Sequence, residues 1–285
     1  MKQNINQWGI LSALVYLSLA LGVSQVAQGA LILQTQDAGG FGSDWNVAIW
    51  GSPAAAPTSG NDYATDGNDV RNTNNVTFGG DTLRVDAGST VITKQDATVT
   101  GGWFLNGGTI TNGDRGNLYT IGGDVAVQAA SIIQSTKGSL SFTGQLLGGA
   151  DLSVNFLGEG VDDQYISFEG GGAYSGTITA GETADTKNFD GWELRLAQSL
   201  ANATVVIGAD TSYDLSNSIT VAGFTADSVT LSAGTYDATD LANAGISSFV
   251  DNGGTLTIAA IPEPSALLFL GSLLGLLAVW RRPRR

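Results

Sequence analysis

Short runs of alternating apolar and polar residues, separated by Gly, Asn and Asp, fill most of this 285-residue chain. Examples are DTLRVDAG, STVITK, GGTITNG, DLSVNF and SVTLSAG. Consecutive runs of this kind are spaced about eight to twelve residues apart. In DLSVNF, Leu152, Val154 and Phe156 share one face of an extended strand, and polar residues share the other. No long helical periodicity interrupts these runs between residues 30 and 260. This body is therefore predicted to be one all-β domain.

Two kinds of all-β architecture fit this spacing, a solenoid and a β-sandwich. Turns of the form Gly-Gly-Thr recur, at Gly107–Thr111 and Gly253–Thr257, the strands are short, and few tight Asn-Gly hairpins occur. These features favour a right-handed parallel β-helix. A β-sandwich, a jelly roll and a mixed arrangement are the alternatives.

The first part of the body departs from the repeat. Residues 31–75 are rich in Gly, Asn, Asp and Ala and contain Trp45, Trp50 and Tyr63. A solenoid needs a cap over its first coil. We expect these aromatic side chains to supply it from looping chain.

The last part of the body is predicted to differ as well. A short helix is expected around Thr239–Ala244, because Asp237 and Asp240 can cap its N-terminus. A last strand is expected at Thr255–Ile258.

The charge of the chain limits its partners. It has 12 basic and 26 acidic residues and a net charge of −14. Five of the basic residues lie outside the body, so the body is more acidic than the whole: Lys2, Arg281, Arg282, Arg284 and Arg285. Such a surface repels phosphate backbones, which excludes nucleic acid as a partner.

The chain contains neither Cys nor His. Disulfides, thiolate nucleophiles, imidazole bases and the usual zinc sites are therefore excluded. Most familiar hydrolase chemistry is excluded with them.

The N-terminal residues have the features of a secretory signal. The apolar run Ile10–Val23 follows Lys2, and the small residues Ala27 and Gly29 flank a cleavage site for signal peptidase. Residues 1–29 are predicted to be a removed signal peptide. An uncleaved anchor is the alternative.

Residues 261–285 combine three further features. Pro262-Glu263-Pro264 precedes a predicted transmembrane helix over residues 265–280, whose apolar part, residues 266–280, would be about 23 Å long and a little short of the bilayer core. The arginines at 281, 282, 284 and 285 follow, and they would stop transfer and stay cytoplasmic. The two prolines hold the chain before the helix extended. A buried core helix is the alternative, but it leaves the arginines unexplained.

This arrangement resembles the PEP-CTERM sorting signal, a Pro-Glu-Pro-Ser motif followed by a hydrophobic helix and an Arg-rich segment. The resemblance covers residues 261–285 and includes Pro262, Glu263, Pro264 and Ser265. It implies recognition by a membrane-embedded exosortase and processing near Pro262 to Ser265. The protein would be held at the inner membrane until then and would afterwards reach the cell surface, outer envelope or extracellular matrix.

The body also resembles the Gly-rich β-solenoid ectodomains of PEP-CTERM proteins and autotransporter passengers. The shared features are a GGTLTI-like ending and an opening of the form WG…P…GNDY…FGGDTL. This resemblance implies an architecture and carries no catalytic residues.

Carboxylates are the most plentiful chemical groups of the body. Asp162 and Asp163, with Glu159 nearby, could form the acid pair of a glycosidase. Adjacent strand residues point to opposite faces, however, so solvated loop acids are the favoured interpretation.

Asp62, Asp66 and Asp69 in NDYATDGND are candidate calcium ligands, since calcium accepts irregular oxygen shells. Ordinary turn chemistry explains the same residues without a metal, and the spacing matches no EF-hand loop. No cofactor other than this candidate calcium is expected.

Aromatic side chains are candidates for stacking on sugar rings. Their positions inside apolar runs are more typical of core or cap packing. The candidates are Trp45, Trp50, Trp103, Tyr165 and Trp192.

These features favour a non-enzymatic, exported structural or adhesive protein of the cell envelope or exopolysaccharide matrix. Its expected partners are signal peptidase, an exosortase, the membrane and a polysaccharide. The alternatives are a carbohydrate-binding module and, less favoured, a polysaccharide lyase or glycosidase, which would need Arg84 or Arg115 together with acids.

Overall fold

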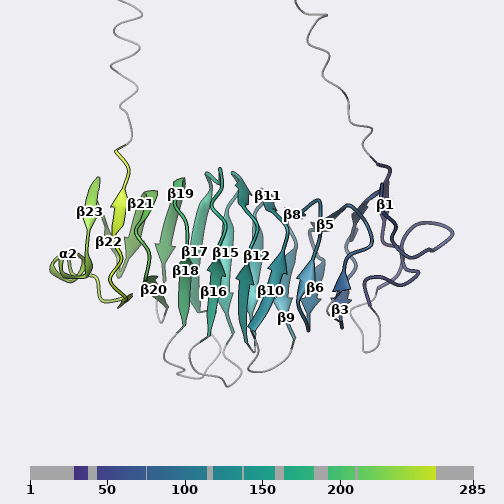
Figure 1. The fold of residues 1–285 in the computed structure, drawn as a ribbon, viewed down its shortest axis with the longest axis horizontal. Coiled ribbons are helices and arrows are strands. Elements are labelled where there is room, and N and C mark those ends of the chain that lie inside the picture. Colours follow the sequence, from purple (N-terminus) through teal and green to yellow (C-terminus); the bar gives the residue numbers. More distant parts are fainter. Residues whose placement is uncertain are drawn as a thin grey trace, which may run out of the picture.

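The computed structural model describes residues 29–37, 44–74, 76–113, 118–136, 138–157, 164–182, 192–208 and 211–260. Nearly all of the regular structure in these residues is β-strand, arranged in three largely parallel sheets. The strands lie side by side along the long axis of the molecule, from β1 at one end to β23 and the helix α2 at the other (Figure 1). The all-β prediction is confirmed.

The chain visits the three sheets in turn. Sheet I contains β1 (Leu31–Leu33), β2 (Asp62–Ala64), β5 (Thr82–Asp86), β8 (Trp103–Asn106), β11 (Val125–Ala129) and β14 (Leu146–Gly148). Sheet II contains β3 (Val70–Asn72), β6 (Thr90–Thr93), β9 (Thr109–Asn112), β12 (Ser131–Ser135), β15 (Leu152–Phe156), β17 (Thr177–Glu182), β19 (Leu200–Ile207), β21 (Ile219–Ala226), β22 (Val229–Thr230), β23 (Gly234–Tyr236) and β25 (Leu256–Ile258). Sheet III contains β4 (Val76–Thr77), β7 (Ala97–Thr98), β10 (Leu118–Gly122), β13 (Ser139–Phe142), β16 (Tyr165–Phe168), β18 (Glu193–Leu196), β20 (Ser212–Leu215) and β24 (Phe249–Asp251).

Each strand pairs in parallel with its counterpart one coil away. Trp103 is in register with Leu83 on one side and with Val125 on the other, so one coil takes about 20 residues. Antiparallel strand pairs occur at the C-terminal end, where β22 pairs with β21 and β23 pairs with β25. This is the pairing of a parallel β-solenoid. A sandwich or jelly roll would require antiparallel sheets, so those alternatives are not observed.

The interior is built from the apolar face of every strand. In β15, Leu152, Val154 and Phe156 are buried while Ser153 and Asn155 are half-exposed, as the alternation predicts. Parallel register brings like residues together. In sheet II one interior row runs through successive coils: Val70, Val91, Ile110, Ile133, Val154, Ala180 and Ile207.

Both Gly-Gly-Thr turns require their two glycines for the same two reasons. The first glycine, Gly107 or Gly253, has a φ near +90°, which a side chain disfavours. The second, Gly108 or Gly254, lies so close to the preceding coil that a Cβ would stand 2.5 Å from Val85 Cγ1 or 2.4 Å from the Asn217 carbonyl oxygen. Glycine is therefore required twice, once for conformation and once for coil-to-coil contact.

Aromatic side chains close the N-terminal end, as predicted. Trp45, Trp50 and Tyr63 are almost completely buried, and each of them packs against Phe78 at 5.4–5.6 Å between ring centroids. Trp45 also contacts Trp103 in the third coil, with 5.7 Å between ring centroids. The looping part of the cap is shorter than predicted, because β2 and β3 already belong to the first coil.

The C-terminal end also agrees with the sequence. Helix α2 covers Ala238–Asn243, with Asp237 as its N-cap, and Asp237 and Asp240 form a reciprocal capping box. Leu241 is the buried residue of this helix, and β25 follows as the last strand.

The coils change shape along the molecule. Sheet I ends at β14, and the later coils alternate between sheets II and III. Where sheet I stops, the Leu146 N–H donates to the Gly171 carbonyl, and the buried Tyr174 hydroxyl donates to the Ala150 carbonyl at 2.7 Å. Burial, together with the nearby Asp151 charge, raises the pKa of Tyr174, so its hydroxyl remains a donor at ordinary pH.

Candidate functional site

The predicted sorting residues lie outside the described part of the chain. They are Ala27, Pro262, Glu263, Pro264, Ser265, Arg281, Arg282, Arg284 and Arg285. Gly29 is described, and it packs against the backbone of Gly60 so closely that a Cβ would stand 2.2 Å from the Gly60 carbonyl oxygen. Within the described residues, no helix has the length and apolar character needed to cross a membrane.

Two of the candidate calcium ligands form separate hydrogen bonds with the next coil. Asp62 accepts a hydrogen bond from Thr82 Oγ1 at 2.6 Å, and Asp69 accepts one from the Thr90 N–H at 2.7 Å. Asp66 is exposed in a left-handed turn with φ 48°. Among the described residues, no group of three or more acids is close enough to hold a metal ion. The structure therefore does not bring Asp62, Asp66 and Asp69 together.

Asp69 belongs to a recurring device of the coils. Four aspartates stand immediately before a strand and accept a backbone N–H from the next coil through Oδ1. They are Asp69 with Thr90 (2.7 Å), Asp96 with Thr120 (2.8 Å), Asp124 with Gln145 (2.8 Å) and Asp151 with Thr177 (3.2 Å). Some of the acidic residues of the body thus join neighbouring coils through hydrogen bonds.

Four of the candidate catalytic residues lie outside the described part of the chain. They are Glu159, Asp162, Asp163 and Arg115. Arg84, on the outer side of β5, is paired with Asp86, and their Nε and Oδ1 atoms are 2.7 Å apart. Burial opposes ionisation of Asp86, but hydrogen bonds from Arg84 and Asn106 outweigh it and lower its pKa. The main role of Arg84 is therefore to form an ion pair with Asp86.

Four of the five candidate sugar-stacking aromatics are buried. Trp45, Trp50, Trp103 and Trp192 are at most 1% exposed, which confirms core and cap packing. Tyr165, in β16, is half-exposed on the outer side of sheet III.

Tyr165 is part of a charged cluster that spans three coils, and we take this cluster as the candidate site. The guanidinium carbon of Arg195, in β18, lies 3.8 Å from the centre of the Tyr165 ring. Arg195 Nη2 is 2.6 Å from Glu193 Oε2, and Arg195 Nε is 3.1 Å from Asp214 Oδ2 in β20. Asn252 Nδ2 donates to Asp214 Oδ1 at 2.8 Å.

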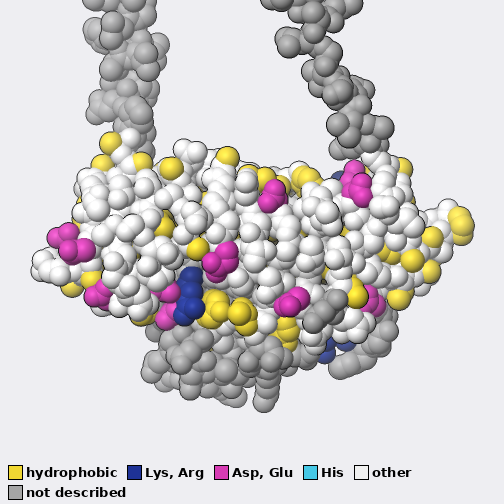
Figure 2. All heavy atoms as spheres, in the orientation of Figure 1, with side chains coloured by type: hydrophobic (Ala, Val, Ile, Leu, Met, Phe, Trp, Pro, Cys, Tyr) yellow, Lys and Arg dark blue, Asp and Glu magenta, His cyan; other side chains and the backbone are white. Residues whose placement is uncertain are grey.

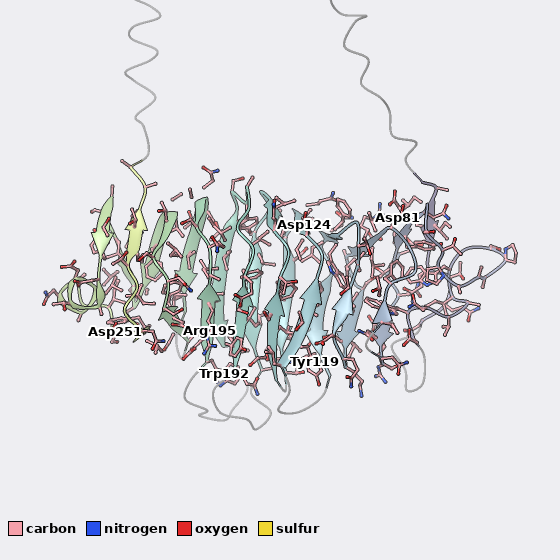
Figure 3. All side chains as sticks on the ribbon, in the orientation of Figure 1. Asp81, Tyr119, Asp124, Trp192, Arg195 and Asp251 are labelled. Carbon is pink, nitrogen blue, oxygen red and sulfur yellow. The ribbon has the colours of Figure 1, made fainter. Side chains whose placement is uncertain are left out.

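The burial of these side chains decreases from Asp214 to Arg195. The side chains of Asp214, Glu193 and Arg195 are 6%, 15% and 37% exposed. Arg195 thus covers two carboxylates while keeping one side in solvent. Along the long axis of the molecule, Arg195 lies between Asp251 and Tyr119 (Figure 3). Both carboxylates accept from the same guanidinium, so the cluster clamps adjacent coils and offers solvent a guanidinium edge and a tyrosine ring.

Sequence reasoning missed this cluster, although part of its signal is local. Glu193 and Arg195 are two residues apart in a strand, so period-two alternation places them on one outer face. Asp214 joins them only because β18 and β20 pair with Arg195 opposite Asp214. That register follows from the coil length, which varies along this chain.

The outer faces of the three sheets differ in charge. Sheet I presents Arg84 and Asp86, and sheet III presents Glu193 and Arg195, whereas none of the described outward side chains of sheet II from β6 to β21 is charged. The exposed or half-exposed non-glycine residues of these strands are Thr90, Ile92, Thr109, Ile132, Gln134, Ser153, Asn155, Thr177, Thr179, Ala201, Asn202, Thr204, Val206, Thr220, Ala222 and Thr225, whereas Thr111 is buried. We call this surface the sheet II outer face. On the side of the molecule shown in Figure 2, by contrast, acidic side chains are spread from one end to the other.

Comparisons with family models, with curated proteins and with solved structures found no match for this chain.

Proposed function

We propose that this chain is an exported structural or adhesive protein of the cell envelope or exopolysaccharide matrix, without enzymatic activity of its own. The observation that carries the proposal is the parallel β-solenoid, in which the described chemical groups are largely engaged in holding coils together. Parallel strands joined by crossovers are overwhelmingly right-handed, which supports a right-handed β-helix. Such a stack is a stiff rod with a long lateral surface.

Export and sorting are proposed from residues that flank the solenoid. Signal peptidase would remove residues 1–29 after Gly29, and the helix at 265–280 would hold the chain at the inner membrane. An exosortase would then act near Pro262-Glu263-Pro264-Ser265 and pass the protein to the cell surface, outer envelope or matrix. The resemblance to PEP-CTERM signals and the order of apolar and basic segments support this route.

Replacing Pro262, Glu263 and Pro264 with alanine tests the sorting proposal. We expect the variant to accumulate as an uncut, membrane-bound form in cells that process the wild-type chain, because the extended recognition segment is lost. Immunoblots of membrane and released fractions would measure this. Alanine replacement of the exposed residues 216–218 is the matched control and should be processed normally. Normal processing of the Pro-Glu-Pro variant would overturn the sorting proposal.

The two other candidate functions receive less support from the described residues. A carbohydrate-binding module built on tryptophan stacking is disfavoured, because Trp45, Trp50, Trp103 and Trp192 are buried. A lyase or glycosidase that uses Arg84 would have to break the pair with Asp86. Tyr165 remains the half-exposed aromatic side chain among the five candidates.

A further inference from the structure

The sheet II outer face is neutral on a strongly acidic molecule. The chain carries a net charge of −14, yet the described outward side chains from β6 to β21 are hydroxyl, amide and aliphatic groups. Arg71, which is in register with Ile92, borders this face at its N-terminal edge and is almost buried. Acidic residues such as Asp151 stand at the strand starts rather than within the face. Lys94, which directly follows β6, is half-exposed, and its side chain lies beside Ile92 next to Gly113, so it borders the face at the same edge as Arg71. From β9 to β21, the described outward side chains of this face are uncharged.

The geometry of this face is regular. Seven parallel strands, β6 to β21, follow one another in sheet II, and at about 4.8 Å between strands they extend about 30 Å. Register places hydroxyl groups opposite each other on neighbouring strands, as in Thr90 with Thr109 and Ser153 with Thr179. At the C-terminal end Thr225 Oγ1 and Thr230 Oγ1 are 3.0 Å apart and share a hydrogen bond. The face is thus an array of donors and acceptors, with methyl groups between them.

A second copy of the chain is a poor occupant. Protein interfaces are anchored mainly by Trp, Tyr, Met and Arg, and such side chains are missing from the outward positions between Thr90 and Thr225 described above. An acidic polymer is also a poor occupant, because the surrounding carboxylates repel it. An uncharged polymer covered with hydroxyl groups fits the hydroxyl and amide groups, and it meets no charge that would lose its water on contact.

We propose that the sheet II outer face binds the surface of an uncharged polysaccharide. The inference rests on the adhesive role proposed above and names its ligand class. Each strand contributes a weak contact, and several strands act together because the rigid solenoid presents them at a constant spacing. Packed, insoluble polysaccharide is therefore the expected ligand, since a short soluble oligosaccharide engages too few strands.

Retention of the purified full chain on polysaccharide particles tests this inference. The probes are cellulose, chitin, mannan and an insoluble β-1,3-glucan, with alginate gel as the acidic comparison. Gln134→Glu places a carboxylate of nearly unchanged size in the middle of the face, and Gln128→Glu places the same group on the exposed part of β11 in sheet I. Both variants have the same net charge, so a difference between them reports the location of the charge.

We expect the wild-type chain and Gln128→Glu to be retained on at least one of the uncharged particles and released from alginate. Gln134→Glu should bind that particle about tenfold more weakly, since its carboxylate loses hydration without gaining a partner. Thr179→Glu, at an exposed position of the same face, should behave like Gln134→Glu. Circular dichroism confirms that each variant is folded.

Three results would overturn the inference. They are failure to bind any uncharged particle, equal retention of Gln134→Glu and Gln128→Glu, and a dimer of the wild-type chain in sedimentation that Gln134→Glu dissociates. Because purified protein is used, these results are independent of sorting. A failure of the Pro-Glu-Pro experiment would leave the binding data unchanged, and a binding failure would leave the processing data unchanged.

Discussion

At the scale of single residues, the aspartates of this protein act mainly as hydrogen-bond acceptors for backbone amides. Asp227 is the extreme case. It occupies a left-handed position with φ 50° in the turn between β21 and β22, and it accepts hydrogen bonds from the backbone and hydroxyl groups of both Ser247 and Ser248. These bonds, above all those from the Ser248 hydroxyl and the Ser247 amide, lower the pKa of Asp227 to about 2. The carboxylate ties the segment after α2 to the turn between β21 and β22.

The pH dependence of stability follows from this shift. A carboxyl group with a lowered pKa in the folded state stabilises the fold above its ordinary pKa of 3.8 and loses that contribution as the pH falls toward 2. Asp227→Asn tolerates the left-handed backbone but accepts fewer hydrogen bonds. We expect it to lower the free energy of unfolding by about 1 kcal/mol at pH 7 and by much less at pH 2. Urea unfolding at both pH values measures this, and an equal loss at both would contradict it.

At the scale of elements, the N-terminal cap shows how aromatic packing closes an open coil. Trp45 and Trp50 are both buried, but their indole N–H groups differ. Trp50 Nε1 donates to the Trp45 carbonyl at 2.9 Å, whereas Trp45 Nε1 is buried without a hydrogen-bond partner within the described residues. The two side chains are thus similarly buried, but only the indole N–H of Trp50 has a hydrogen-bond partner within the described residues.

This difference predicts an order of stabilities. Replacing either residue with Phe removes similar volume, but only Trp50→Phe also removes a hydrogen bond and leaves a buried carbonyl short of a donor. We expect Trp50→Phe to be about 1 kcal/mol more destabilising than Trp45→Phe. Urea titrations followed by far-ultraviolet circular dichroism would measure the two values. Equal stabilities, or the reverse order, would show that the hydrogen bond is not the cause.

At the scale of the whole molecule, the solenoid is a stack in which each coil contacts its neighbours. Leu146 is in register with Val125 one coil earlier, and Val125 is in register with Trp103. Deleting residues 125–145 would therefore remove one complete coil and place Leu146 over Trp103. The interior rows would remain continuous.

We expect this coil deletion to fold into a shorter solenoid. Its urea m-value should fall, because less surface is exposed on unfolding. Deleting residues 125–135 instead is the matched control. It removes about half a coil, places the sheet III residues of β13 where the sheet I residues of β11 belong, and should leave the chain unfolded or aggregated. Similar circular dichroism spectra and unfolding curves for the two deletions would contradict the coil register.

The local features of this fold could be predicted because each depends on a few neighbouring residues. Alternation in DLSVNF predicts which side of β15 is buried, the double glycines predict turns, and Asp237 predicts the start of α2. The separation of Asp62, Asp66 and Asp69 could not be predicted, because their hydrogen-bond partners lie in the next coil. The pairing of Arg195 with Asp214 was missed for the same reason.

The sequence by itself determined the strand period, the turn positions and the acidity. Only the tertiary structure decided that the strands pair in parallel, that sheet I ends at β14, and that threonines from separate coils share one face. The physical reason is that side-chain direction follows from two-residue alternation, whereas coil-to-coil register depends on the lengths of all the turns between the paired strands.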